Sequence, residues 1–262
     1  MQKLAFVLLL VSASVFSQEQ KLVAEKTGHF YFRADAYAGH DNFGFQYFIK
    51  DNAFVKTNGK DKLEFQKLAY GKLTRADVSN PLLIVLFYEN FNAVVLLDNQ
   101  LNEVKSLNFN ELQIPVVARA VGLAAQNRLW VYDGLTQQIG LYDYLKNSYQ
   151  VLSTPLRESI HYYQTDFNHF QWVDSKSVWH ACDLFGKITD LGKLPRHDLV
   201  YFSPNAYFAY SDDGKLYIKN LKNNMLYSIS GIDNSYKKFY AEAQNLSIFT
   251  SSGITNYKIT IP

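Results

Sequence analysis

A polar turn between two strand-like apolar runs recurs along the chain at a nearly constant interval. The clearest copies are "LWVYDGLTQQIGLYD", which turns near Gly134, and "FAYSDDGKLYIKN", which turns near Asp213. Related turns lie near Asp51, Asn90, Ser175 and Ser252. Neighbouring turns are roughly forty residues apart, and a period of that size is typical of a chain built from repeated supersecondary units.

A second set of segments repeats with the same period in a different phase. Ahead of the hairpins lie "RADAYAG", "RADVSN", "RAVGLA", "YQTDF", "YFSPN" and "YAEAQ", which begin at Arg33, Arg75, Arg119, Tyr163, Tyr201 and Tyr240. Behind the hairpins lie further strand candidates such as "KLEFQKL", "EVKSLNF", "SYQVLS" and "NMLYSIS". Each unit therefore holds four strands. The period and the strand count predict an all-β fold, a six-bladed β-propeller with four-stranded blades.

The sixth unit reaches Pro262 directly after its third strand, which would leave a sheet edge unpaired. The segment "QKLVAEKTGHF" ahead of Arg33 supplies a spare strand. We expect this N-terminal strand, at about residues 20–27, to complete the last blade and close the ring. An open pair of β-sandwiches is the alternative, but it does not explain the period.

The first residues have the three-part layout of a cleavable secretory signal. Lys3 lies in a short positive start, Leu4 to Val11 is purely apolar, and small residues lead to a cleavage point after Ser17. The apolar run is shorter than the roughly 20 residues that span a bilayer, and no Cys stands at the cleavage point to accept a lipid. We expect residues 1–17 to be a signal peptide, residues 18–262 to form a single propeller domain, and the mature protein to be periplasmic.

Charge and cysteine content narrow the classes of partner. The chain has 26 Lys and Arg against 24 Asp and Glu, a balance that favours neither nucleic acid nor an anionic membrane as a partner. We therefore expect no nucleic-acid binding and no direct membrane insertion. The single Cys182 cannot form an internal disulfide, and its place in "WHACDLFG" predicts a small buried hydrophobe.

Sequence signatures of catalysis are absent: there is no G-x-S-x-G, no H-E-x-x-H and no phosphate-binding glycine loop. In a strand, His180 and Cys182 share one face while Asp183 points the other way, which does not order a catalytic thiol. We predict a protein without catalytic residues, metal or cofactor. Two alternatives stay open. Asp77, Asp166 and Glu242 could bind a metal in a lactonase-like hydrolase at the channel mouth, and exposed aromatic residues could bind carbohydrate.

The innermost strands of a propeller line its channel, so their side chains define what the ring can bind. Three arginines in one half and three tyrosines in the other are the candidate binding residues: Arg33, Arg75, Arg119, Tyr163, Tyr201 and Tyr240. Arg and Tyr are enriched in protein-binding hot spots. The alternative is that Arg33 and Arg75 pair locally with Asp35 and Asp77 and only line a wet channel. The turn from Phe87 to Asn92 is a further candidate contact.

The segment "VFSQ" and the hairpins "LFYENFNAVVLLDNQLNEV" and "LWVYDGLTQQIGLYDY" resemble exported β-propellers of Bacteroidota. Some members of that group are accessories of outer-membrane machinery, and the Plug subunit of the type IX secretion translocon is similar in size and build. The resemblance implies a protein-binding accessory of an outer-membrane protein complex for export or assembly, with no catalytic residue. Cargo of that pathway ends in a sorting domain, whereas here the last blade runs into "NYKITIP". We therefore expect a periplasmic resident.

Overall fold

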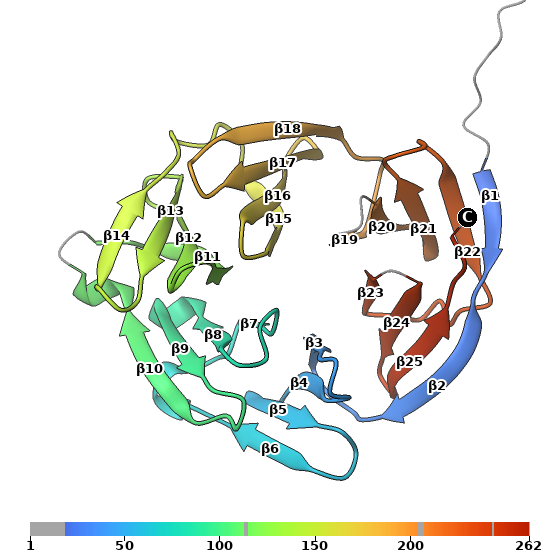
Figure 1. The fold of residues 1–262 in the computed structure, drawn as a ribbon, viewed down its shortest axis with the longest axis horizontal. Helices are drawn as coiled ribbons and strands as arrows, with labels where there is room; N and C mark the ends of the chain where they lie inside the picture. The colour runs from blue at the N-terminus through green and yellow to red at the C-terminus, as the bar shows by residue number, and fades with distance from the viewer. Residues whose placement is uncertain (1–18, 113–114, 204–206, 243, 262) are drawn as a thin grey trace, which may run out of the picture.

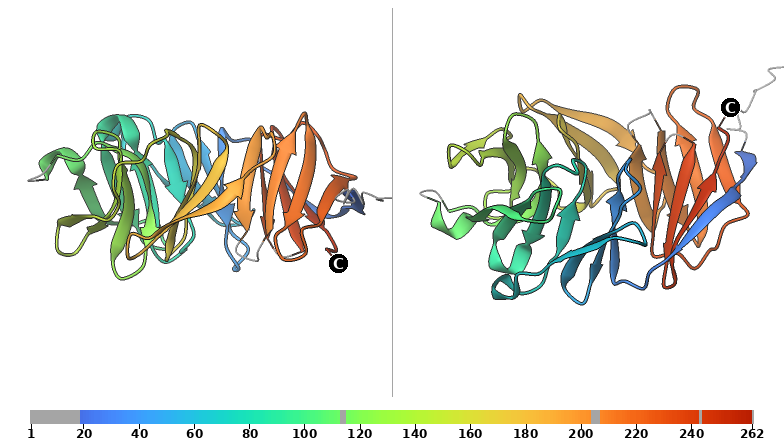
Figure 2. Two further views of the ribbon diagram at one scale, coloured as in Figure 1. Left: turned by 90° about the horizontal axis from the view of Figure 1, so that it is seen from above. Right: turned by 60° about the horizontal axis from the view of Figure 1, so that its bottom comes forward.

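The computed structural model of the protein describes residues 19–112, 115–203, 207–242 and 244–261. The expected signal peptide, residues 1–17, lies outside the described residues. Within them, six β-sheets stand around a central channel, and the side views show a flattened disc (Figures 1 and 2). The predicted six-bladed β-propeller is confirmed.

Each blade repeats one antiparallel order from the channel outward. The inner strands of blades one to six are β3 (Ala36–His40), β7 (Arg75–Asp77), β11 (Ala118–Ala124), β15 (Ile160–Thr165), β19 (Leu199–Ser203) and β23 (Lys238–Glu242). The second strands are β4 (Gln46–Lys50), β8 (Ile84–Tyr88), β12 (Arg128–Asp133), β16 (His169–Asp174), β20 (Tyr207–Asp212) and β24 (Asn245–Thr250).

The hairpin turns predicted from the period join the second strands to the third. The third strands are β5 (Ala53–Thr57), β9 (Ala93–Leu97), β13 (Gln138–Asp143), β17 (Val178–Asp183), β21 (Lys215–Asn220) and β25 (Gly253–Lys258). The outer strands are β6 (Lys62–Phe65), β10 (Glu103–Asn108), β14 (Ser148–Val151), β18 (Ile188–Lys193), β22 (Leu226–Ser230) and, in blade six, β2 (Glu25–Tyr31).

The hydrophobic core consists of separate clusters, each between two neighbouring blades. Strand β8 shows why the middle strands are apolar throughout: all its residues are buried. Val85 and Phe87 pack toward blade three, while Leu86 and Tyr88 pack toward blade one. Successive strand residues face opposite sides of a sheet, so a strand between two blades needs apolar residues at every position.

The N-terminal segment closes the ring, but differently from the expectation for residues 20–27. Strand β2 pairs antiparallel with β25 and completes blade six, whereas β1 (Glu19–Val23) pairs in parallel with β22 and adds a fifth strand to blade five (Figure 1). Ala24, between the two strands, is buried, and its amide donates to the Ser230 carbonyl at 2.9 Å. This anchored crossing divides the expected single strand into two.

Every inner strand leads its blade and pairs antiparallel with the second strand, so all six inner strands run the same way along the channel. We call the face where they begin the leading face and the face where they end the trailing face. The turns between second and third strands lie on the leading face. The turns between inner and second strands lie on the trailing face.

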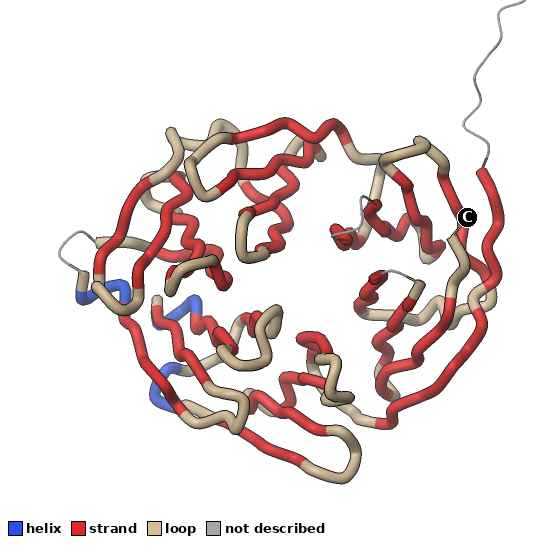
Figure 3. The backbone as a smooth tube through the Cα atoms, viewed as in Figure 1, coloured by secondary structure: helices blue, strands red, loops and turns tan. Residues whose placement is uncertain are grey.

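The helices in the described residues are three short 3-10 turns, η1 (Leu68–Tyr70), η2 (Glu89–Phe91) and η3 (Phe109–Glu111), drawn in blue in Figure 3. This agrees with the predicted all-β fold. Within the described ranges, no helix has the length and apolar character needed to cross a membrane. Cys182 is buried, which confirms its predicted place, and burial raises the pKa of its thiol to about 12.

Candidate functional site: the central cavity

A cavity of about 710 Å³ occupies the channel, a volume within the usual range for ligand pockets. All six inner strands contribute to its wall. Of the six residues predicted for the channel, Arg75, Arg119, Tyr163, Tyr201 and Tyr240 line it. Lys238 also lines it, and the sequence reasoning did not single out this residue.

Arg33 is exposed and lies in the segment between β2 and β3, apart from the cavity-lining residues. Strand register explains the difference. Arg75 pairs with Phe87, the residue next to the end of β8. In blade one the residue next to the end of β4 is Ile49, and it pairs with Ala36. The residue of blade one that is structurally equivalent to Arg75 is therefore Ala36, three positions after Arg33, although "RADAYAG" and "RADVSN" align from their arginines.

Arg75 reaches across the channel from blade two to blade four. Its Nη2 donates to the Tyr163 carbonyl at 3.0 Å, and its guanidinium carbon lies 3.9 Å from the centre of the Tyr163 ring. The Tyr163 hydroxyl in turn lies 3.4 Å from the Val121 carbonyl of blade three. This contact fixes the guanidinium of Arg75 inside the cavity rather than on a face.

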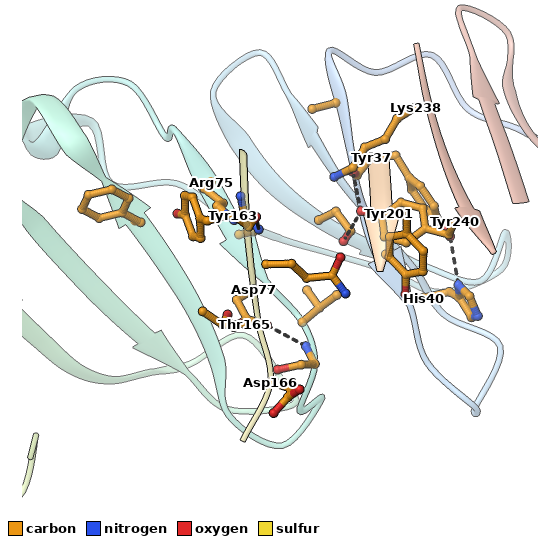
Figure 4. Close-up of a pocket in the computed structure, with 18 of the residues that line it drawn as sticks. Tyr37, His40, Arg75, Asp77, Tyr163, Thr165, Asp166, Tyr201, Lys238 and Tyr240 are labelled. Atoms are coloured by element: carbon orange, nitrogen blue, oxygen red, sulfur yellow. Dashed lines mark hydrogen bonds between the residues drawn. The ribbon is translucent and has the colours of Figure 1, made fainter. Parts of the chain in front are cut away.

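Tyr240 and Tyr201 form the opposite wall, as Figure 4 shows. Their ring centres are 5.2 Å apart, with the rings edge to face, and Tyr240 makes a similar contact with Tyr37. The Tyr240 hydroxyl donates to the Ala38 carbonyl at 2.8 Å. Burial raises the pKa of Tyr240 well above its ordinary value, so its phenol stays neutral.

Lys238 lies beside Tyr240 on the same wall. Its Nζ is 3.2 Å from the Tyr37 carbonyl and 4.8 Å from the centre of the Tyr240 ring. Burial of the amine by the surrounding protein and, after it, the charge of Arg75 lower the pKa of Lys238 to about 7. The sequence pattern singled out Tyr240 as a channel residue. Lys238, two positions earlier, is the residue of this strand that carries a charge into the cavity.

The carboxylates considered for a metal site, Asp77, Asp166 and Glu242, all line the cavity. Asp77 accepts from the amides of Ser79 and Leu123, at 2.9 and 2.8 Å, and lies 3.3 Å from the Thr165 hydroxyl. Asp166 accepts from the amides that follow it in its turn. In the part of the chain that the structure describes, no three His, Cys, Asp or Glu side chains form a group able to hold a metal.

The local pairing considered for the arginines is not observed. Asp35 accepts from the Asp51 amide at 2.8 Å, and no ion pair between described residues joins Arg33 to Asp35 or Arg75 to Asp77. His180 Nε2 donates to the Asp174 carboxylate at 3.0 Å, so the imidazole is hydrogen-bonded to this carboxylate rather than to the Cys182 thiol.

Arg119 lies at the leading-face mouth of the cavity, with its side chain 56% exposed, and forms a 3.0 Å ion pair with Glu89 of blade two. Its stem passes over Gly134, where an added Cβ would be 2.5 Å from Cγ. Leu135, 69% exposed, follows in the same turn, and Phe91, 40% exposed, follows Glu89 in η2. We call Glu89, Phe91, Arg119 and Leu135 the mouth patch.

The turn from Phe87 to Asn92, predicted as a contact, is buried at both ends and exposed at its tip. Phe91 stacks on Tyr70 of the preceding connection, with ring centres 4.6 Å apart. The ends of this turn are therefore buried between blades, and its tip faces solvent.

No protein-family model matches the chain, and no curated protein matches its sequence. Among solved structures, a member of the DUF4221 family from Bacteroides vulgatus superposes with a TM-score of 0.60 at 8% identity, covering 94% of this chain and 98% of that one. Virginiamycin B lyase from Staphylococcus aureus gives a TM-score of 0.59 at 12% identity, covering 85% and 79%.

A looser match, with a TM-score of 0.49 and 9% identity, covers 93% of this chain and 39% of PorZ, a surface component of the type-IX secretion system of Porphyromonas gingivalis. Likeness at these identities shows the fold alone. The chain is a six-bladed β-propeller, and the solved structures to which it is similar include an enzyme, virginiamycin B lyase.

Proposed function

We propose that the protein is a non-catalytic, protein-binding propeller that docks through its leading face onto an outer-membrane export or assembly complex from the periplasmic side. The observation that carries the proposal is the mouth patch. It combines an exposed arginine with an exposed aromatic and an exposed aliphatic side chain on one face. Arg and aromatic residues dominate the energetics of protein interfaces.

The mouth patch is preorganised, which lowers the entropy lost on binding. The ion pair with Glu89 and the passage over Gly134 position Arg119, while stacking on Tyr70 positions Phe91. The patch joins blades two and three, so a partner bound there would contact two blades at once. A type IX-like, Plug-like role is the specific form of the proposal.

An affinity capture of the tagged protein from gently solubilised membranes, with and without crosslinking, tests this docking. We expect an outer-membrane component to be captured by the native protein and at least tenfold less by an Arg119→Ala, Leu135→Ser double variant. Phe185→Ser is the matched control: Phe185 is 92% exposed and lies between β17 and β18 on the trailing face. Elution of the native protein alone in both conditions rejects the proposal, and equal loss in the control rejects the leading face.

The periplasmic location rests on the expected signal peptide and is tested by fractionation. We expect the mature protein in the osmotic-shock fraction, with an N-terminus at Gln18. The metal-dependent hydrolase alternative would be supported by stoichiometric calcium or zinc in the purified protein together with lactone or ester turnover. Binding to a glycan array would support the carbohydrate alternative.

A further inference from the structure

Two cations occupy equivalent places on the channel wall in blades two and six. Lys238 pairs with Phe249, the residue next to the end of β24, as Arg75 pairs with Phe87 next to the end of β8. The two side chains therefore lie at the same depth of the channel. Figure 4 shows the Lys238 amine and the Arg75 guanidinium turned toward the space between them.

Neither cation is neutralised by the protein. No ion pair between described residues involves Arg75 or Lys238; both donate to backbone carbonyls and lie against tyrosine rings. Carbonyls and rings orient a cation but do not cancel its charge. Arg75 and Lys238 thus bring two cations to one depth of a cavity whose wall also holds the carboxylates of Asp77, Asp166 and Glu242, and the low-dielectric walls strengthen the field of the two cations where they face each other.

We propose that Arg75 and Lys238 form an anion-binding site inside the cavity that takes the carboxylate of an organic ligand whose apolar body packs against the tyrosine wall. An Arg guanidinium binds a carboxylate through two parallel hydrogen bonds, and a Lys amine adds a point charge from the other side. Tyr201 and Tyr240 present ring surface beside the cations. This anion site lies inside the cavity, and the proposal does not depend on docking of a partner at the mouth patch.

Binding at this site is coupled to a proton. The groups that face Lys238 are the Arg75 guanidinium of β7, Tyr37 of β3 and Tyr240 of its own strand; Tyr201 of β19 and Tyr162 of β15 surround Tyr240. The walls and Arg75 hold the pKa of Lys238 at about 7, and a bound carboxylate raises it because an opposite charge favours the ammonium form. Above pH 7, the ligand therefore binds with uptake of a proton, and affinity falls as pH rises.

Isothermal titration with phenylacetate, and with phenylacetamide as its neutral match, tests the site. We expect phenylacetate to bind and the amide to bind at least tenfold more weakly. Between pH 8 and pH 9, well above the Lys238 pKa of about 7, the phenylacetate affinity should fall by about tenfold, the slope for uptake of one proton. Titrations at pH 8 in Tris and in HEPES should give different apparent enthalpies, because the buffer supplies that proton.

Lys238→Met should weaken phenylacetate at least tenfold and abolish the dependence on buffer. Lys237→Met is the matched control, an exposed lysine one position earlier on the chain. A peptide ending in a free Phe carboxylate, compared with its C-terminal amide, distinguishes a peptide terminus from a free acid as the source of the group. Absence of phenylacetate binding at 10 mM, equal binding of the amide, or full affinity in Lys238→Met would each overturn the proposal.

Discussion

The Arg75 guanidinium carbon lies 3.9 Å from the centre of the Tyr163 ring and so connects blade two to blade four across the channel, bypassing blade three. The apolar clusters join immediate neighbours, and the Thr165 hydroxyl, 3.3 Å from Asp77, makes a second contact between blades two and four. The Arg75–Tyr163 contact therefore stabilises the positions of blades two and four relative to each other, which the apolar clusters do not join directly.

Replacing Arg75 with Ala should lower the free energy of unfolding by about 1–3 kcal/mol, since a stacked cation and a charge-assisted hydrogen bond to the Tyr163 carbonyl are lost together. Urea unfolding followed by tyrosine fluorescence measures the difference. Arg119→Ala is the control, because its exposed ion pair with Glu89 contributes about 0–1 kcal/mol. Equal losses in the two variants would show that the cross-channel contact has no special weight.

Gly122→Ala tests how closely blades three and four approach. A Cβ at Gly122 would lie 1.9 Å from the hydroxyl oxygen of Thr165. This hydroxyl donates to Asp77, 3.3 Å away. We expect destabilisation of about 1–3 kcal/mol or more, the usual range for overpacking. Gly28→Ala, also in a strand, has nothing within 4 Å of the new methyl group and should leave the melting temperature almost unchanged. A neutral Gly122→Ala variant would contradict the described packing.

The free energy of unfolding should depend on pH in part through titration of Asp174. Burial alone raises the pKa of this carboxyl, but hydrogen bonds from the Val178 amide, His180 and the Lys176 amide outweigh burial and hold the pKa below its usual value. Unfolded Asp has a pKa of about 3.9. The stability that the carboxylate contributes is therefore complete well above pH 4 and is lost as pH falls through the lower folded pKa.

Asp174→Asn should consequently be less stable than the native protein at pH 7, with a gap that narrows between pH 5 and pH 3 as the native carboxylate is protonated. Urea midpoints at pH 7, 5, 4 and 3 measure that gap. Asp213→Asn, at an exposed turn, should give a curve parallel to the native one. A gap for Asp174→Asn that stays constant over this range would show that the carboxylate is not held in the way described.

Shortening the N-terminus should separate the roles of β1 and β2. A chain that begins at Ala24 loses the parallel strand, whose Leu22 packs on the blade-five core while Val23 is exposed. We expect a melting temperature lower by about 2–4 °C, the shift that corresponds to about 1 kcal/mol in a domain of this size. A chain that begins at Phe32 also loses β2 and Phe30, and we expect it to be cleaved rapidly in limited proteolysis. Equal behaviour of the two chains would contradict this division of roles.

The propeller was predictable from the sequence because every blade has the same packing requirement. Every blade needs a middle hairpin that is apolar on both sides, so the pattern around Val85 and Phe87 returns in each unit and reports the period. The separate identity of β1 was not predictable. Its sequence, "EQKLV", has little alternation to set a register, and its pairing depends on the edge that β22 presents in space.

The channel residues were predicted only in part, because sequence phase is not the same as depth along the channel. Aligning Arg75 with Tyr240 overlooked Lys238, which register places opposite the equivalent position in β24. The same phase error assigned Arg33 to the channel wall. Register depends on turn length and on bulges such as the shift between Tyr37 and Gly39, and neither is visible as a change in composition.

The crossing at Ala24 has a consequence for biosynthesis. Residues 19–31 pair only with β22 and β25, which the ribosome makes more than 190 residues later, since Glu19 pairs with Leu226 and Glu25 with Lys258. Until those strands emerge, the earliest part of the propeller has no partner for its backbone hydrogen bonds. The strand pairs of residues 19–31 therefore form only after the last blade has been synthesised, so closure of the ring is a late step in folding of the nascent chain.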